Sequence, residues 1–172
     1  GQDTFQSGRT AAGLMNEMTN GKGQVAVISG QIANPGLISR QKGFTTEIKE
    51  SFPELEVVDI RYSYDDEWVA SKIVEELLEL YPELTGIYIT GHGVKGVCQT
   101  LKKLGKDRSM HVIANDFLEE NKKWLQDGTI NFLIGQDAAV QGHSPVTILF
   151  QLLFDSKAPE KEFQYTDIVI RT

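Results

Sequence analysis

The stretch that decides the fold is Gln24-Val25-Ala26-Val27-Ile28-Ser29, a short run of mainly small and β-branched apolar residues. Similar runs return at residues 55–60, 86–90, 110–114 and 130–134. Each run is followed by a stretch in which apolar residues recur with helical spacing. Short apolar strands that alternate with amphipathic helices are typical of a parallel sheet covered on both faces. The sequence therefore predicts an α/β fold built on a doubly wound parallel sheet.

The segments around these runs predict helices and one further strand. The clearest helix is Glu67–Leu80, in which Ile73, Val74 and Leu77 recur on one face. The other helices are expected at residues 4–19, 37–52, 91–104, 118–126 and 138–154, and a terminal strand is expected at 162–170. No internal repeat or long linker divides the 172 residues. A chain of this length can bury one substantial core.

Composition excludes several classes of protein. Seventeen Lys and Arg face 24 Asp and Glu, which gives a net charge of -7 and leaves no basic stripe for nucleic acid. No apolar run approaches the roughly 20 residues that a membrane span needs, so no membrane partner is expected. The one cysteine, Cys98, cannot form an internal disulfide and lies in a predicted helix. We expect it to be a buried structural thiol.

Signatures of catalysis and of cofactor binding are missing from the sequence. Gly21-x-Gly23 precedes its strand, whereas a dinucleotide-binding turn would follow one. No phosphate-binding Walker loop and no Gly-x-Ser-x-Gly elbow occurs. His92, His111 and His143 lack the spacing of metal ligands. The prediction is a protein that is not an enzyme and that has no cofactor, no metal and no catalytic residue.

Polar side chains instead gather where the predicted strands end. Asp116 and Gln136 come directly after two strands, and ligands of open parallel sheets bind beyond the carboxyl ends of the strands. Asp116 offers acceptor oxygens, Arg40 a rigid fork of donors and Gln136 both kinds of group. Tyr62 and Tyr64 could lay an aromatic face against a sugar ring. These groups suit a neutral ligand that is rich in hydroxyl groups.

Each of these side chains also has a structural alternative. Arg40 could pair with Glu47 or Glu50 on its own helix, and Asp116 could only cap the helix that follows it. The tyrosines could pack within their loop. The shared position at one sheet edge favours a binding site over these alternatives.

Several motifs along the chain match one known pattern. They are Gly1-Gln2-Asp3 with Gly8-Arg9-Thr10-Ala11-Ala12, Ser39-Arg40-Gln41-Lys42-Gly43-Phe44, Val112-Ile113-Ala114-Asn115-Asp116, the block 127–136 with Gln141-Gly142, and the closing segment 165–171. With these motifs the chain resembles the sugar-sensing domain of lactose-repressor (LacI-type) transcription regulators. That family shares its fold with periplasmic ribose-type binding proteins. The resemblance runs through the whole chain and implies a periplasmic-binding-protein-like type I fold.

The resemblance also implies roles for individual residues. Arg40 stands where the family has a ligand-contacting arginine, and Asp116 where it has a ligand-binding aspartate. Gln136 stands at the position of a binding or hinge glutamine. Gln2 and Asp3 lie in what looks like the first hinge crossing between two lobes.

The chain departs from the family pattern at two places in the implied site. The family often ends its third strand with Asn-Asp, whereas this chain has Thr90 and, after Gly91, His92 as candidate ligand contacts. The family's common aromatic residue aligns near Asp65, beside Tyr64, and both are carried as candidate contacts. The identity of the sugar therefore does not follow from the resemblance.

The resemblance implies the carboxy-terminal part of a two-lobed ligand-binding domain. Residues 1–136 and 158–172 are expected to form the carboxy-terminal lobe, and residues 137–157 to belong to the amino-terminal lobe. The expected protein is a cytoplasmic LacI-family regulator that forms a homodimer. A sugar-like effector is expected to control allosterically the binding of operator DNA through an upstream helix-turn-helix. The alternative is an extracytoplasmic sugar-binding protein of an ABC transporter. An upstream helix-turn-helix would favour the regulator, and a cleavable signal peptide would favour the transporter.

The helix expected at 138–154 carries more apolar residues than one lobe would need. Leu149, Phe150, Leu153 and Phe154 require a surface that covers them. We expect that this helix either pairs with another copy or stays loosely ordered. The alternative is that it folds back onto its own lobe.

Overall fold

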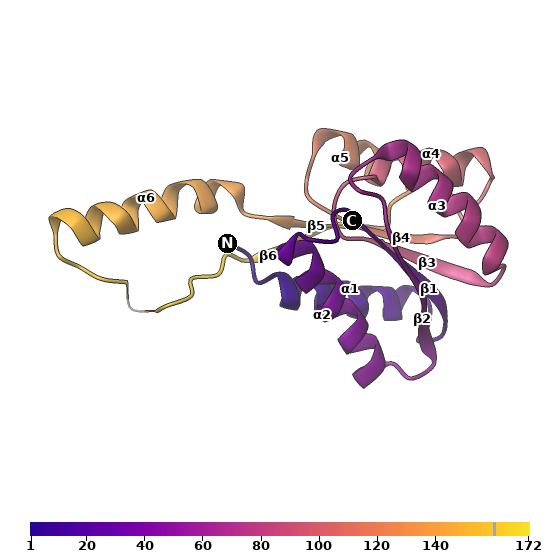
Figure 1. The fold of residues 1–172 in the computed structure, drawn as a ribbon, viewed down its shortest axis with the longest axis horizontal. Helices are drawn as coiled ribbons and strands as arrows, with labels where there is room; N and C mark the ends of the chain where they lie inside the picture. The colour runs from indigo at the N-terminus through magenta and orange to yellow at the C-terminus, as the bar shows by residue number, and fades with distance from the viewer. Residues whose placement is uncertain (160) are drawn as a thin grey trace.

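The computed structural model describes residues 1–159 and 161–172, and its centre is a six-stranded sheet (Figure 1). The strand order is β2-β1-β3-β4-β5-β6, and only β6 runs antiparallel to its neighbour. The strands are β1 (Gly23–Ser29), β2 (Leu55–Tyr62), β3 (Leu84–Ile89), β4 (His111–Asn115), β5 (Phe132–Gln136) and β6 (Ile168–Arg171). The predicted doubly wound parallel sheet is confirmed.

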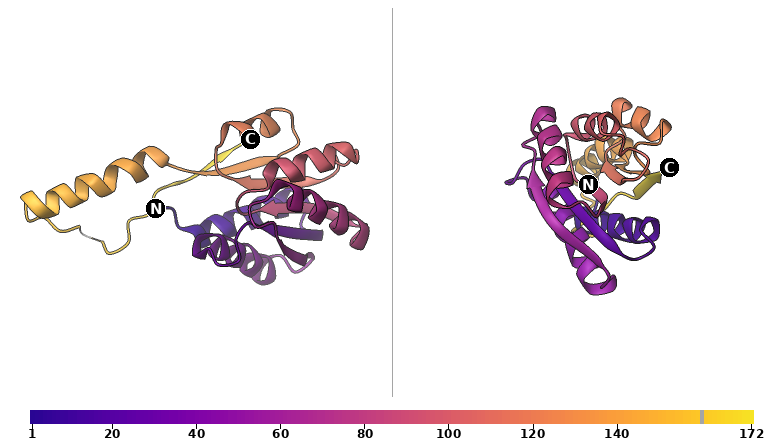
Figure 2. Two further views of the ribbon diagram at one scale, coloured as in Figure 1. Left: turned by 45° about the horizontal axis from the view of Figure 1, so that its top comes forward. Right: turned by 90° about the vertical axis from the view of Figure 1, so that its right-hand side faces the viewer.

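Helices cover both faces of the sheet, and each side has its own apolar core (Figures 1 and 2). The helices are α1 (Thr4–Met18), α2 (Pro35–Ser51), α3 (Glu67–Leu80), α4 (Val94–Lys103), α5 (Glu119–Gln126) and α6 (Ala138–Phe154). One core joins α1 and α2 to the sheet, and the other joins α3 and α4 to the opposite face. Residues 25–29 of β1 are buried throughout, because helices lie on both sides of this strand. That burial explains the unbroken apolar run.

Local signals set the ends of several helices. The side chains of Asp3, Asn34, Asp66 and Asp137 accept backbone N–H bonds at the starts of α1, α2, α3 and α6. Such caps satisfy donors that have no partner within the helix. Helix α4 starts later than predicted because Gly93 has a left-handed φ of 95°, which keeps residues 91–93 out of the helix.

The terminal strand is shorter than the sequence predicted. The structure forms β6 only over Ile168–Arg171, where it pairs with β5, and residues 162–165 are exposed. Among the described residues, no strand pairs with residues 162–165 to receive their backbone hydrogen bonds. Thr166 alone makes an isolated bridge, to Gln2. The prediction of a strand from residue 162 was wrong for this reason.

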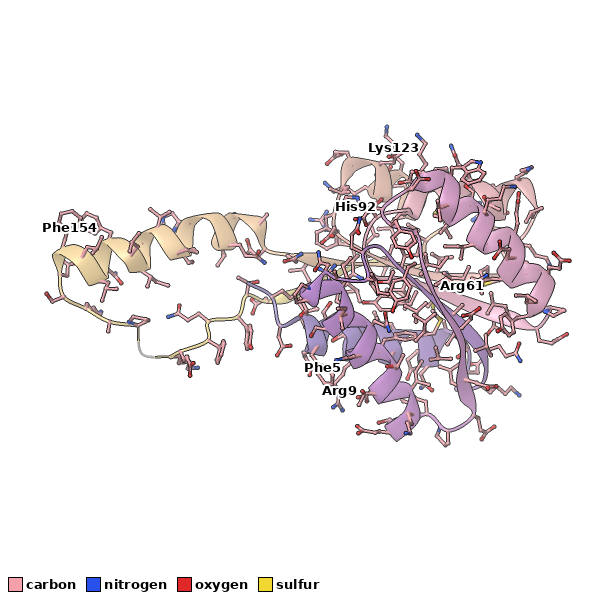
Figure 3. All side chains as sticks on the ribbon, viewed as in Figure 1. Phe5, Arg9, Arg61, His92, Lys123 and Phe154 are labelled. Carbon is pink, nitrogen blue, oxygen red and sulfur yellow. The ribbon has the colours of Figure 1, made fainter. Side chains whose placement is uncertain are left out.

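Helix α6 projects away from the body of the molecule, with Phe154 near its far end (Figures 1 and 3). None of its residues is buried, and Leu153 and Phe154 are 67% and 73% exposed. The alternative that the helix folds back onto its own lobe is therefore not what the structure shows. Elsewhere Cys98 is fully buried in α4 as expected, and burial raises the pKa of its thiol. Over the described ranges, no helix has both the length and the apolarity that crossing a membrane requires.

We expect the exposed face of α6 to drive association of this chain with itself. Covering one large apolar side chain stabilises a complex by about 1.5–3 kcal/mol. Replacing Leu149 and Leu153 together with lysine should therefore turn an associating chain into a monomer in sedimentation velocity. His143→Lys, at another exposed position of α6, is the control and should still associate. Well-folded monomers for both the wild type and the double variant would contradict the expectation.

Candidate functional site

Arg40 lies in the second turn of α2, with its guanidinium beneath the carboxyl edge of the sheet. Only 4% of the residue is exposed. Its Nη1 donates to the backbone oxygen of Thr90 over 2.8 Å, and its Nη2 lies 3.5 Å from Oδ1 of Asp116. It does not pair with Glu47, which bonds Arg9 instead. The guanidinium is thus held by one carbonyl and one carboxylate.

Asp116 follows β4 in a left-handed conformation with a φ of 70°. Its backbone N–H donates to Ile134 O over 2.8 Å, and the Nδ2 of Asn121 donates to its carbonyl oxygen over 3.0 Å. The N-cap residue of helix α5 is Leu118, which makes no side-chain capping bond. The alternative that Asp116 serves as a helix cap is therefore excluded. The side chain of Asp116 is 37% exposed, and its carboxylate faces the guanidinium of Arg40 instead.

Gln136 ends β5 and completes the group. Its Nε2 donates to Oδ1 of Asp116 over 3.1 Å, so a single carboxylate oxygen contacts both Arg40 and Gln136. The predicted convergence of these three side chains at one sheet edge is confirmed. Because a carboxylate has two acceptor oxygens, the lone pairs of Oδ2 are left for ligand hydroxyls.

A hollow of about 420 Å³ opens over these residues. Asp65 and His92 also line it, together with Arg40, Asp116 and Gln136. Figure 3 shows His92 on the body of the molecule, toward the side from which α6 departs. The volume lies within the range of about 300–1,000 Å³ that is usual for small-molecule sites.

Three candidate contacts are not brought to this hollow. The side chain of Thr90 is fully buried, and its hydroxyl donates to the Oγ of Ser29 over 2.9 Å. The hydroxyl therefore does not reach the hollow, and the expectation that it contacts a ligand is corrected. Thr90 supports the site through the carbonyl oxygen that holds Arg40. Tyr64 is 57% exposed and does not line the hollow, and Tyr62 donates to Gln41 over 3.3 Å. The structure thus places neither tyrosine where it could stack on a sugar in this hollow.

The expected hinge residues lie where three chain segments run side by side. Gln2 is buried, forms a bridge with Thr166 and donates from Nε2 to Gly135 O over 2.9 Å. Asp3 caps α1 through the backbone N–H of Gln6. These contacts join the amino-terminal segment to the two segments that link the body to α6, which follow β5 and precede β6. The hinge role itself stays a prediction.

Several residues that support the site carried no signal in the sequence. Asn121 holds the left-handed turn at Asp116 from the next helix, five residues away. The Nδ2 of Asn115 donates to the hydroxyl of Tyr88 over 2.9 Å and to Ile89 O over 3.1 Å. Burial raises the pKa of Tyr88 to about 12, so this phenol stays neutral beneath the site. Only Asn115, a polar residue inside an apolar run, could have been singled out from the sequence.

The remaining histidines lie away from this group. His111 is half-buried in β4, where desolvation lowers its pKa, and His143 is exposed on α6. Within residues 1–159 and 161–172, no cluster of three or more His, Cys, Asp or Glu is placed to hold a metal ion.

Comparison with known proteins gives a consistent result. The sequence model for the periplasmic binding protein domain matches residues 1–157. The D-allose-binding periplasmic protein of Escherichia coli K12 is 24% identical over 157 residues, which are 87% of this chain and 50% of that protein. The chain thus spans half the length of this relative.

Solved structures agree over the whole chain. A sugar-binding protein of a sugar ABC transporter from Bacillus halodurans superposes with a TM-score of 0.93 at 26% identity, over 100% of this chain and 62% of that one. An ABC transporter solute-binding protein from Burkholderia graminis, in complex with D-arabinose, gives a TM-score of 0.90 at 27% identity over 100% and 60%.

These findings correct two expectations. The cytoplasmic location is contradicted, because the similar proteins are a periplasmic protein and transporter sugar-binding proteins. The LacI-type regulator is not supported either, since the same comparisons favour the transporter alternative. For the motifs at Arg40, Asp116 and Gln136 the family resemblance implies a sugar cleft, and both kinds of protein share such a cleft. These motifs carry no information about DNA or about location.

Proposed function

The chain belongs to the periplasmic binding protein family, and we propose that it supplies one half of the sugar site of an extracytoplasmic protein that serves an ABC transporter. The observation that carries the proposal is the contact of Arg40 and Gln136 with one oxygen of Asp116. This arrangement orders two donors around an acceptor before any ligand arrives. A sugar hydroxyl that both donates and accepts matches such a pattern.

The domain division expected from the sequence supports the same function. In this proposal residues 1–136 and 158–172 form one lobe, and residues 137–157 belong to a second lobe that closes over the sugar. The projection of α6 from the body is consistent with that division (Figure 1). Binding would favour the closed state only to the extent that the sugar contacts both lobes better when they are closed. The residues act by binding and orientation, without a covalent step.

The ligand class follows from the site and from the relatives together. The hollow is lined by Arg40, Asp65, His92, Asp116 and Gln136, which are polar groups suited to hydroxyls. The Burkholderia protein holds D-arabinose, and the Escherichia protein is named for D-allose. We therefore propose a monosaccharide as the ligand. A LacI-type regulator with operator DNA and a homodimeric partner is the weaker candidate, because none of the similar proteins reported above is a regulator.

Replacing Asp116 with alanine tests the proposal directly. Loss of the carboxylate removes the acceptor for the sugar and leaves Arg40 and Gln136 without their shared partner. The cost of stranding such groups is about 1–3 kcal/mol, which corresponds to a loss of affinity of roughly 5- to 150-fold. Isothermal titration calorimetry of the intact protein with D-allose, D-arabinose, D-ribose and D-glucose measures this loss of affinity.

A control variant and two further outcomes complete this test. Glu79→Ala, which removes an exposed carboxylate of α3, should leave the affinity unchanged. An unchanged affinity for Asp116→Ala would remove Asp116 from the site. A wild-type protein that binds none of the four sugars would contradict the proposed ligand class.

A further inference from the structure

Gln141 lies in the first turns of α6 and reaches back into the site. Its Nε2 donates to Oε1 of Gln136 over 3.0 Å and to the hydroxyl of Thr166 over 3.2 Å. Both bonds are partly buried. One primary amide thereby contacts two of the segments that link α6 to the body.

The chemistry of the neighbouring groups fixes which way the amide of Gln136 is turned. Asp116 as a carboxylate only accepts hydrogen bonds, so Gln136 must turn its NH2 group toward Asp116. The carbonyl oxygen of Gln136 then points the opposite way and requires a donor. Gln141 provides that donor. The amide of Gln136 is therefore held in one of its two orientations from both sides.

The same side chain also joins the hinge segments. Thr166 forms the bridge to Gln2, and its backbone N–H donates to Gly1 O over 2.9 Å. Gln2 in turn donates to Gly135 O, next to Gln136. The first, middle and last segments are thus connected around Gln141. Because these bonds connect α6 to the body, a rotation of α6 relative to the body would change them.

We propose that Gln141 is a positioning residue that locks the amide of Gln136 and thereby couples the hinge to the sugar site. It does not line the hollow, and it acts through Gln136. The donor and acceptor pattern that the sugar meets depends on this lock, because a flipped Gln136 would turn its oxygen against the carboxylate of Asp116. This inference rests on the proposed sugar-binding function.

Two substitutions at Gln141 test the proposal in the intact protein. Gln141→Met keeps the length of the side chain and removes its donor, so the affinity for a monosaccharide that the wild type binds should fall about tenfold. Gln141→Glu replaces the donor with a carboxylate that attracts the NH2 of Gln136 and competes with Asp116. At pH about 8 its loss of affinity should be at least as large as that of Gln141→Met.

The pH dependence of Gln141→Glu separates positioning from a merely structural role. A glutamic acid has an ordinary pKa of about 4.3, and a neighbouring carboxylate raises it. Below that pKa the protonated carboxyl group donates again, as the original amide does. The affinity of Gln141→Glu should therefore approach that of the wild type as the pH falls from about 8 to about 4.5. A structural defect would not recover with protonation.

The controls distinguish a failure of the positioning role of Gln141 from a failure of the proposed sugar-binding function. Gln99→Met, at an exposed position of α4, should bind like the wild type. Thr166→Val removes the second acceptor of Gln141 and should cost a smaller factor, about threefold. If the wild type binds sugar and Gln141→Met and Gln141→Glu bind it within twofold at both pH values, the positioning role is wrong while the proposed function stands. If Gln141→Met does not fold, the pH dependence of Gln141→Glu decides.

Discussion

Replacing Arg40 with methionine is expected to weaken sugar binding by about 100-fold or more. The guanidinium is almost fully buried, donates a hydrogen bond to Thr90 O and forms an ion pair with Asp116. Methionine fills a similar volume but provides no donor. Each charge-assisted hydrogen bond contributes about 1.5–3 kcal/mol, and the sugar is expected to lose its contacts with Arg40 as well as the ordered position of Asp116.

Arg40→Met should also lower the stability of the fold. The carboxylate of Asp116 is partly exposed, so water compensates for part of the lost ion pair. The carbonyl of Thr90 is left without its donor, and a lowering of the unfolding free energy by about 1–3 kcal/mol follows. Urea-induced unfolding measures this change, and titration calorimetry measures the affinity.

Two controls define this experiment. Arg40→Lys keeps the charge but loses the fork that serves two acceptors at once, so an intermediate affinity is expected. Arg108→Met removes an exposed arginine, whose side chain is 69% accessible, and should change neither quantity. An Arg40→Met protein that folds and binds sugar like the wild type would show that the guanidinium is not part of the site.

Replacing Gly8 with alanine is expected to destabilise the fold by about 2–3 kcal/mol. A Cβ at this position of α1 would lie 2.0 Å from the carbonyl oxygen of Arg40 and 2.8 Å from the backbone N of Phe44. These are backbone atoms of α2, so no side chain can rotate away. The helices must separate, and overpacking of this kind costs about 1–3 kcal/mol or more. The higher helix propensity of alanine offsets only part of that cost.

The same helix provides the matched control for Gly8→Ala. A Cβ at Gly13 of α1 meets nothing within 4 Å, so Gly13→Ala should stabilise the protein by about 0.5–1 kcal/mol through helix propensity alone. Chemical unfolding of both variants separates the contact from the propensity. Because Arg40 lies on the helix that Gly8 touches, Gly8→Ala should also weaken sugar binding. Equal stability of Gly8→Ala and the wild type would contradict the close approach of α1 and α2.

Part of the binding site could be predicted from the sequence because strand ends are readable from hydrophobic patterns. Asp116 and Gln136 are the first polar side chains after two apolar runs, and parallel strands end at one edge. Arg40 was included for the donor chemistry of its guanidinium and was supported by the family resemblance, but nothing in a helical pattern tells a buried arginine from an exposed one. Thr90 was misjudged because the polar partner of its hydroxyl, Ser29, lies on the neighbouring strand. A one-dimensional pattern does not show such a partner.

The expected location was wrong, and the expected regulatory role is not supported, for a different reason. The motifs that carried the resemblance are those expected of a sugar site between two lobes, and transporter proteins and regulators share that kind of site. What separates them is the rest of the protein and its destination. The residues at 40, 116 and 136 are compatible with both, so the comparisons with similar proteins were needed to correct the location.

By itself the sequence determined the α/β class, the strand-helix alternation and the sheet edge at which Asp116 and Gln136 meet. These features follow from burial, which leaves a periodic trace in the chain. Only the tertiary structure decided that Asp116 shares one oxygen with Arg40 and Gln136, that Thr90 turns inward, and that Gln141 reaches back from α6. Hydrogen bonds between distant segments depend on distances of a few tenths of an ångström, and these are set by packing rather than by periodicity.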